Sequence, residues 1–318
     1  MVLQSIKSVF ALMTLIGIGY YFTGKPWFGK PGMDFLSKFT VDVTIPFYMF
    51  YNIYQDIGSR KALLSLVFKL PVTFSLILLC IGLATAVGTI VRVSEGRRFT
   101  FVAAAGFSNV VFIGFPVIQT LWGSSVTSIG VIYYISSTVL FWTLGVWLLQ
   151  KDGRTVRTQE GRPFAGLKNL ISPPIMGMLF AMAAIFFGIQ VPDFILKPLS
   201  MITGVTSPLA LIFIGSVIRN MDQSSIKFGR DIYAALAMRF IVVPAVAAVF
   251  LRLMPVASDM KQVFFMLSTM PSMTQMGIMA REYKSDYGFA CEVVMLTTII
   301  SLFTIPLFMF LIQKFSIF

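Results

Sequence analysis

The sequence predicts an all-α integral membrane protein: ten transmembrane helices in two inverted five-helix repeats, with broken fourth and ninth helices that cross. Three observations carry this prediction. Of the 318 residues, 57% are hydrophobic and only 12% are charged, which leaves little material for a soluble domain. The apolar residues form stretches of about 20, the length that a helix needs to cross a bilayer. Two of these stretches, one in each half of the chain, are interrupted by proline and by small polar residues.

Ten spans follow from the alternation of apolar stretches and polar loops. They are expected at Ser5–Phe22, Leu36–Tyr54, Leu70–Val91, Thr100–Leu121, Val126–Leu149, Ser172–Gly188, Phe194–Ile218, Ile232–Leu253, Val263–Arg281 and Gly288–Ile312. The longest polar interval, Gln150–Asn169, separates five spans from five. We therefore expect a first repeat over residues 1–150, a cytoplasmic loop over residues 151–170 and a second repeat over residues 171–318.

The two halves are expected to be inverted copies, because five is an odd number and the second half then enters the membrane from the opposite face. Prolines in corresponding spans support this pairing. Pro46 and Pro208 lie in the second and seventh spans, and Pro71 and Pro244 lie in the third and eighth. The two interrupted spans form a third pair.

Lysine and arginine residues set the expected orientation. In alternate loops they number sixteen on one side of the membrane and eight on the other. The richer side faces the cytoplasm under the positive-inside rule. Both termini then lie outside, in a multi-pass protein of a bacterial inner membrane.

The composition excludes several classes of protein. The chain has no histidine, so it has no histidine-based catalytic triad, metal cluster or proton relay. Cys80 and Cys291 both lie in apolar segments and are expected to be buried rather than bonded to each other. The net charge of +12 comes from loops between spans, which disfavours nucleic acid as a partner. A phosphate-binding loop of the ATPase type is also missing from the sequence.

The first interruption lies within Gly106–Pro116. Ser108 and Asn109 are expected to end one half-helix, because their side chains suit a helix cap. Gly114 and Pro116 are expected to begin the next one, because proline suits the first turn of a helix. These four residues are candidate substrate-binding residues.

The second interruption lies within Leu267–Tyr283 and carries more polar side chains. Pro271 is expected at the restart of the helix, with Ser272, Thr274 and Gln275 as nearby substrate-binding groups. If the half-helices cross, their N-terminal ends point into one cavity and bind a carboxylate without lysine or arginine. The alternative is a pair of kinked packing helices with small residues at their contacts.

Three ionisable residues lie inside the expected spans, where a charge is costly and usually functional. Arg239, in the eighth span, is a candidate substrate or counter-ion residue, and the alternative is a structural pair or an interfacial side chain. Asp42 lies about one turn from the expected start of its span, and Glu292 lies near the start of the tenth. Each is a candidate proton carrier or an interfacial cap.

A set of ordered motifs resembles the auxin efflux carrier family over essentially the whole chain. The motifs are Asn109, Gly114 and Pro116 of the fourth span, Ser172–Gly177, Ser207–Gly215, Pro271 followed by Ala280–Tyr283, and Ile305–Leu307. The short loop after the fifth span is similar to the bacterial branch rather than to the plant carriers with a large insert.

The resemblance implies ten helices in two inverted repeats, a scaffold of helices one, two, six and seven that is often dimeric, and a moving transport unit. It also implies organic anions as substrates, which are auxin in plants and malate- or malonate-like carboxylates in bacteria. Asn109, Pro116 and Pro271 map onto the substrate-facing crossing. Gln275 departs from the asparagine that many bacterial relatives carry.

The expected function is therefore secondary transport of a small organic anion, a mono- or dicarboxylate, by alternating access of the elevator type. Coupling to a proton, to a sodium ion or to neither stays open. The alternative is a sodium-coupled bile-acid-type symporter, in which Thr274 and Gln275 help to hold the ion. A cation/proton antiporter needs carboxylates at the crossing, and the fifth span has none. We expect no catalytic residue, cofactor or metal, and we expect membrane lipid and a second copy of the chain as partners.

Overall fold

A computed structural model of the protein describes residues 14–61, 69–123, 126–156, 173–220 and 229–315. Within these ranges the regular secondary structure is helical throughout. Between residues that the structure describes, β-type pairing consists of one isolated antiparallel bridge, which joins Ser108 to Ser272. The all-α prediction is therefore confirmed.

The first half of the chain begins with a helix over residues 14–23. Its further helices, with π-helical turns written η, are α2 (Gly29–Phe39), η1 (Thr40–Thr44), α3 (Ile45–Ile57), α5 (Leu70–Ile90), α6 (Arg98–Gly106), η2 (Val110–Gly114), α7 (Phe115–Trp122), α8 (Thr127–Leu140), η4 (Phe141–Gly145) and α9 (Val146–Val156). Those of the second half are α11 (Pro173–Phe186), α12 (Asp193–Asn220), α13 (Arg230–Ala237), η5 (Met238–Val242), α14 (Val243–Leu253), α15 (Ser258–Ser268), α16 (Met276–Glu282) and α17 (Tyr287–Phe315).

Apart from the breaks at residues 107–109 and 269–275 and a few end residues, helices cover the described parts of the expected spans. Among the described residues, five stretches are long and apolar enough to cross a membrane by length and composition, namely Leu70–Ile90, Ile129–Gly153, Asp193–Ser216, Arg230–Leu253 and Tyr287–Ile312. The start of the first expected span and most of the expected loop over residues 151–170 lie outside the described residues. Pro71 is the second residue of α5, and Pro244 is the second residue of α14, which follows η5 within the helical stretch Arg230–Leu253.

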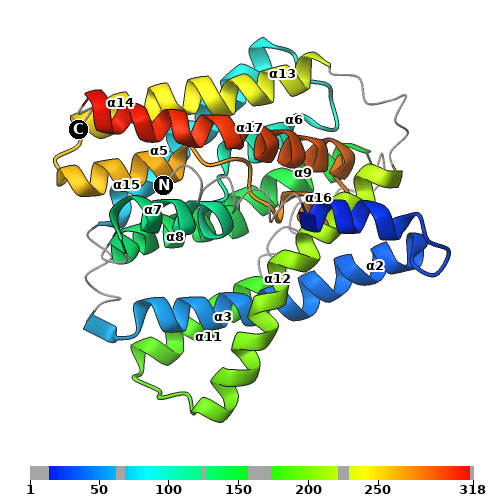
Figure 1. The fold of residues 1–318 in the computed structure, drawn as a ribbon, viewed down its shortest axis with the longest axis horizontal. Helices are drawn as coiled ribbons and strands as arrows, with labels where there is room; N and C mark the ends of the chain where they lie inside the picture. The colour runs from blue at the N-terminus through cyan, green and yellow to red at the C-terminus, as the bar shows by residue number, and fades with distance from the viewer. Residues whose placement is uncertain (1–13, 62–68, 124–125, 157–172, 221–228, 316–318) are drawn as a thin grey trace.

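The helices form two groups (Figure 1). The smaller group contains the helix over residues 14–23 with α2, α3, α11 and α12, and the larger group contains α5–α9 and α13–α17. Close backbone approach holds the smaller group together. A Cβ atom on Gly215 would collide with the carbonyl of Ile16, and one on Gly177 would collide with the carbonyl of Pro46. Glycine at these positions lets the helices pack backbone against backbone, as small residues do in membranes.

Three of the π-helical turns end two residues before a proline. They are η1 before Pro46, η2 before Pro116 and η5 before Pro244. Proline lacks an N–H group and its ring clashes with the carbonyl four residues back. A wider turn relieves this clash without ending the helix, and such turns are frequent at functional sites. Two of the candidate charged residues, Asp42 and Arg239, lie on these turns.

Candidate functional site

Both predicted interruptions exist, at slightly different positions from those expected. Helix α6 ends at Gly106 and η2 begins at Val110, so the first half-helix stops two to three residues early and the chain becomes helical again before Gly114. Pro116 is the second residue of α7, behind η2, rather than the first turn after the break. The second break runs from residue 269 to residue 275, and Pro271 lies within it, ahead of the start of α16. Neither proline therefore begins a half-helix, because the backbone resumes the helix elsewhere.

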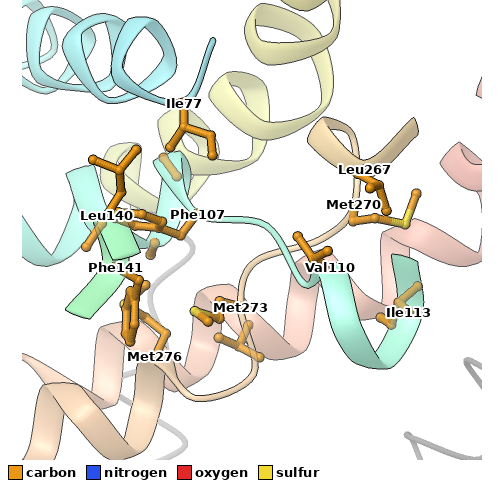
Figure 2. Close-up of a cluster of buried hydrophobic side chains, with 14 of the residues drawn as sticks. Ile77, Phe107, Val110, Ile113, Leu140, Phe141, Leu267, Met270, Met273 and Met276 are labelled. Carbon is orange, nitrogen blue, oxygen red and sulfur yellow. The ribbon is translucent and has the colours of Figure 1, made fainter. Parts of the chain in front are cut away.

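The two breaks lie side by side and run in opposite directions (Figure 2). The backbone N–H of Asn109 donates to the Pro271 carbonyl at 2.8 Å, and the N–H of Met273 donates to the Phe107 carbonyl at 3.2 Å. Each broken segment therefore pairs with the other one. This satisfies backbone groups that would otherwise be costly away from water.

Side-chain hydrogen bonds add to this backbone pairing. Asn109 Nδ2 donates to Thr274 Oγ1 across the two segments. Ser272 Oγ donates to the Ala104 carbonyl at 2.6 Å, and the Ser272 N–H donates to Thr297 Oγ1 of α17 at 3.1 Å. Ser272 and Thr274 thus hold the two segments together.

Arg239 lies beside this junction, and its side chain is buried, with 1% of the residue exposed. Its Nε donates to the Met270 carbonyl at 2.6 Å, its Nη1 to the Ala105 carbonyl at 3.0 Å and its Nη2 to the Ser268 carbonyl at 2.7 Å. Met270 lies in the second break, Ser268 is the last residue of α15, and Ala105 lies in the last turn of α6. The guanidinium therefore bonds to the C-terminal ends of both half-helices. The sequence did not indicate these backbone partners.

A small cavity of about 10 Å³ lies where the two segments meet. This volume is at the lower limit of what a single water molecule needs. Its lining residues are Ser108, Asn109, Val110, Met273 and Gln275 from the two segments, Tyr48 and Met49 from α3, and Tyr134, Ser137 and Thr138 from α8. All of these side chains are uncharged, and they come from both helix groups.

Three of the predicted substrate-binding residues line this cavity, namely Ser108, Asn109 and Gln275. The residues Ser272 and Thr274 support the segments, as described above. Gly114 packs against α15, where an added Cβ would lie 2.7 Å from Leu267 Cδ2. The side chain of Pro116 lies outside the described residues.

Sequence reasoning missed the part of the cavity wall that α3 and α8 provide. A signal was present in α8, because Tyr134, Ser137 and Thr138 follow the spacing that places residues on one helix face. For Tyr48 and Met49 no local pattern distinguished them from other residues of an apolar span.

The two candidate carboxylates do not line the cavity. Asp42 is exposed on η1, in a continuous helical stretch that begins at Gly29, before the apolar stretch does. Its role as a proton carrier or as an interfacial cap stays a prediction. Glu292 is buried in the second turn of α17, and its Oε1 has no hydrogen-bond partner among the described residues.

Asp152 is a buried carboxylate that sequence reasoning also missed. It lies on α9 and accepts hydrogen bonds from the N–H groups of Phe99 (3.1 Å) and Thr100 (2.6 Å) and from Thr100 Oγ1 (2.7 Å). These donors belong to the first turn of α6, where unpaired N–H groups and the positive end of the helix dipole favour an anion. Asp152 therefore anchors the half-helix that leads into the first break.

The sequence as a whole matches known transport proteins. Residues 4–309 match the family described as membrane transport protein. The chain is also 25% identical to an uncharacterized transporter of Methanocaldococcus jannaschii, over 94% of this chain and 96% of that protein. It is 23% identical to an uncharacterized transporter of Methanothermobacter thermautotrophicus, over 95% of this chain and 97% of that protein.

The chain therefore belongs to the membrane transport protein family, and the resemblance to the auxin efflux carriers is confirmed. It is a multi-pass membrane transporter and not an enzyme. Both relatives come from archaea, so the likeness reaches beyond the bacterial branch that the short loop suggested.

Proposed function

We propose that this transporter carries a small organic anion, a mono- or dicarboxylate, by alternating access, and that the anion binds where the two interrupted segments meet. The observation that carries the proposal is the cavity lined by Ser108, Asn109 and Gln275. The helical stretch from Val110 to Trp122 begins at this cavity, and the positive end of its dipole suits a carboxylate. The side-chain amides of Asn109 and Gln275 supply further donors.

The charge distribution around the cavity supports an anion as the substrate. Its lining contains no charged side chain. The buried cation Arg239 bonds to the carbonyls of Ala105 and Met270, which lie only a few residues before Ser108 and Ser272. A buried positive charge attracts an anion over such a distance more strongly in protein than in water.

The movement that we propose is of the larger helix group against the smaller one. The cavity wall combines residues of both groups, because Tyr48 and Met49 belong to α3. An ion pair between Arg281 of α16 and Asp34 of α2 also joins the groups. Sliding of one group past the other would open the cavity to one side of the membrane and then to the other. A cavity of this size must widen before an anion can enter, which such a movement would provide.

The topology that we propose consists of ten transmembrane helices in two inverted repeats, over residues 1–150 and 171–318, joined by a cytoplasmic loop. The antiparallel pairing of the two breaks supports it, because inverted repeats bring equivalent segments together in opposite directions. The lysine and arginine count supports an inner-membrane protein with both termini outside. Family resemblance supports a homodimer, and Asp42 and Glu292 stay candidate proton carriers.

The test is substrate binding measured as a thermal shift of the purified protein with a panel of mono- and dicarboxylates. We expect one class of acid to raise the unfolding temperature of the wild type. In Asn109→Ala the shift should disappear, with at least a tenfold loss of affinity, equivalent to about 1.4 kcal/mol. The control is Asn220→Ala, an exposed asparagine at the end of α12, which should keep the shift. A shift with sodium or with bulky neutral compounds, and with no carboxylate, contradicts the proposal.

A further inference from the structure

The guanidinium of Arg239 has no carboxylate partner in the described part of the chain. The ion pairs found there join Arg97 to Asp231 and Asp286, and Arg281 to Asp34. Arg239 instead uses Nε, Nη1 and Nη2 on three backbone carbonyls at 2.6–3.0 Å. Because a buried charge is costly unless it is compensated, these carbonyls must provide the compensation.

The three carbonyls form a typical site for a small cation. They belong to the C-terminal ends of α6 and α15 and to the break that follows α15, where the last carbonyls of a helix have no partner within it. The negative ends of both helix dipoles also point to this place. In transporters with interrupted helices, such carbonyl ends coordinate the coupling sodium ion.

We propose that Arg239 is a built-in cation that takes the place of a coupling sodium ion at the junction of the two interrupted segments, so that this junction needs no sodium. The guanidinium fills the three acceptors from η5 of the neighbouring span. A sodium ion could bind them only by displacing it or by lying beside it, and two cations this close repel each other strongly in a buried site.

The proposal extends to substrate binding, and in that part alone it rests on the proposed function. A cation fixed in the protein gives the anion site its positive charge in every step of the cycle. A bound ion would have to arrive and leave with the substrate. Affinity for the anion should therefore be the same with and without sodium. In the sodium-coupled symporter that the sequence left as an alternative, affinity for the substrate should instead depend on sodium.

The first experiment uses the wild-type protein in detergent, without substrate, in sodium, potassium or choline chloride at equal ionic strength. We expect the same unfolding temperature in all three salts. A higher unfolding temperature in sodium alone would overturn the proposal. If a carboxylate substrate has been identified, its affinity should also be equal in the three salts, and a sodium-dependent affinity would overturn the extension. Failure to find any substrate leaves the result without substrate intact, so this proposal and the proposed function fail separately.

The second experiment compares Arg239→Ala with Arg252→Ala, an exposed arginine in the last turn of α14. Arg239→Ala should lower the unfolding temperature by about 5 °C or more, whereas Arg252→Ala should leave it unchanged. Guanidinium chloride or sodium chloride at tens of millimolar should restore at least half of the loss relative to choline chloride. Equal behaviour of the two variants, or no rescue by either small cation, would overturn the proposal.

Arg239→Lys covers the case in which Arg239→Ala does not fold. This variant keeps one positive charge but cannot reach three carbonyls at once. It should fold with a lower unfolding temperature than the wild type and should show no sodium-specific stabilisation, because its ammonium group still occupies the cation position. A higher unfolding temperature of Arg239→Lys in sodium chloride than in potassium or choline chloride would contradict the assignment.

Discussion

The two interrupted segments pair with each other and differ in how they are held. The first break covers residues 107–109 and the second covers residues 269–275, and they pair with each other through two backbone hydrogen bonds. The second break contains Ser272, Thr274 and Gln275, and it lies next to two of the three carbonyls that bind Arg239. Beside the first break, the guanidinium bonds to the Ala105 carbonyl in the last turn of α6.

The anchors of the two segments also lie at different places. The helix before the first break is fixed at its start by Asp152. The helix before the second break starts without a side-chain cap at Ala257, and the segment is fixed at the break itself by Thr297. Two segments that pair with each other are therefore held by different side chains at different places.

The largest effect that tests this comparison is expected for Asp152→Ala. The change leaves the N–H groups of Phe99 and Thr100 without their acceptor at the start of α6. Hydrogen bonds to a charged group are among the strong ones, so the free energy of unfolding should fall by about 3 kcal/mol. Denaturant titration in detergent micelles measures this change.

The matched control is Asp259→Ala at the start of α15. Asp259 is exposed, and within the described ranges its carboxylate accepts a hydrogen bond only from the N–H of its neighbour Met260. Its removal should have almost no effect on the free energy of unfolding. If the two variants lose the same stability, the two half-helices are anchored alike and the comparison fails.

A smaller loss is expected for Thr297→Val, which tests the anchor of the second segment. Valine keeps the shape of threonine but removes the acceptor of the Ser272 N–H. A buried N–H without a partner costs about 1–3 kcal/mol, so the free energy of unfolding should fall by about 2 kcal/mol. The same titration applies.

Thr298→Val provides the comparison for this variant. Thr298 is equally buried, but its hydroxyl donates only to the Val294 carbonyl within its own helix. We expect Thr298→Val to lower the free energy of unfolding by only a few tenths of a kcal/mol, because the Val294 carbonyl keeps its place in the helix. A loss as large as that of Thr297→Val would mean that packing, rather than the bond to Ser272, explains the effect.

The smallest effect distinguishes the two serines that face each other in the bridge. Ser272 Oγ donates to the Ala104 carbonyl, whereas Ser108 Oγ makes no comparable bond to the backbone. Ser272→Ala should therefore cost about 1 kcal/mol of unfolding free energy, and Ser108→Ala should cost much less. Ser108 lines the cavity, so its variant should instead weaken substrate binding. The reverse order of stabilities would show that the second segment is not the one held by side chains.

Much of the architecture was predictable because membrane spans obey strong local rules. The length of apolar stretches gave the helices, and proline with small polar residues gave both breaks to within a few residues. The exact restart positions were wrong, since a proline can be accommodated behind a π-helical turn as well as at a helix start. The helix that leads to Asp42 also begins earlier than the apolar stretch, because α2 starts at Gly29.

Side-chain partners were less predictable because they depend on residues far apart in the sequence. Asn109 and Gln275 were predicted as binding residues because they are amides beside a break, and both line the cavity. The residues Tyr48 and Met49 belong to the same cavity only because the two helix groups pack together there. Asp152 is similar, since its role depends on α6 lying beside α9.

The sequence by itself therefore determined that this is a helical membrane transporter with two interrupted helices, because hydrophobic length and proline act locally on the backbone. Only the tertiary structure decided which groups compensate each other. It placed Arg239 on the carbonyls of both half-helices, and the sequence left that residue open between a substrate role and a structural one. The physical reason is that a charge in an apolar interior is stabilised by whichever polar groups the fold brings within hydrogen-bond distance, and no local pattern specifies them.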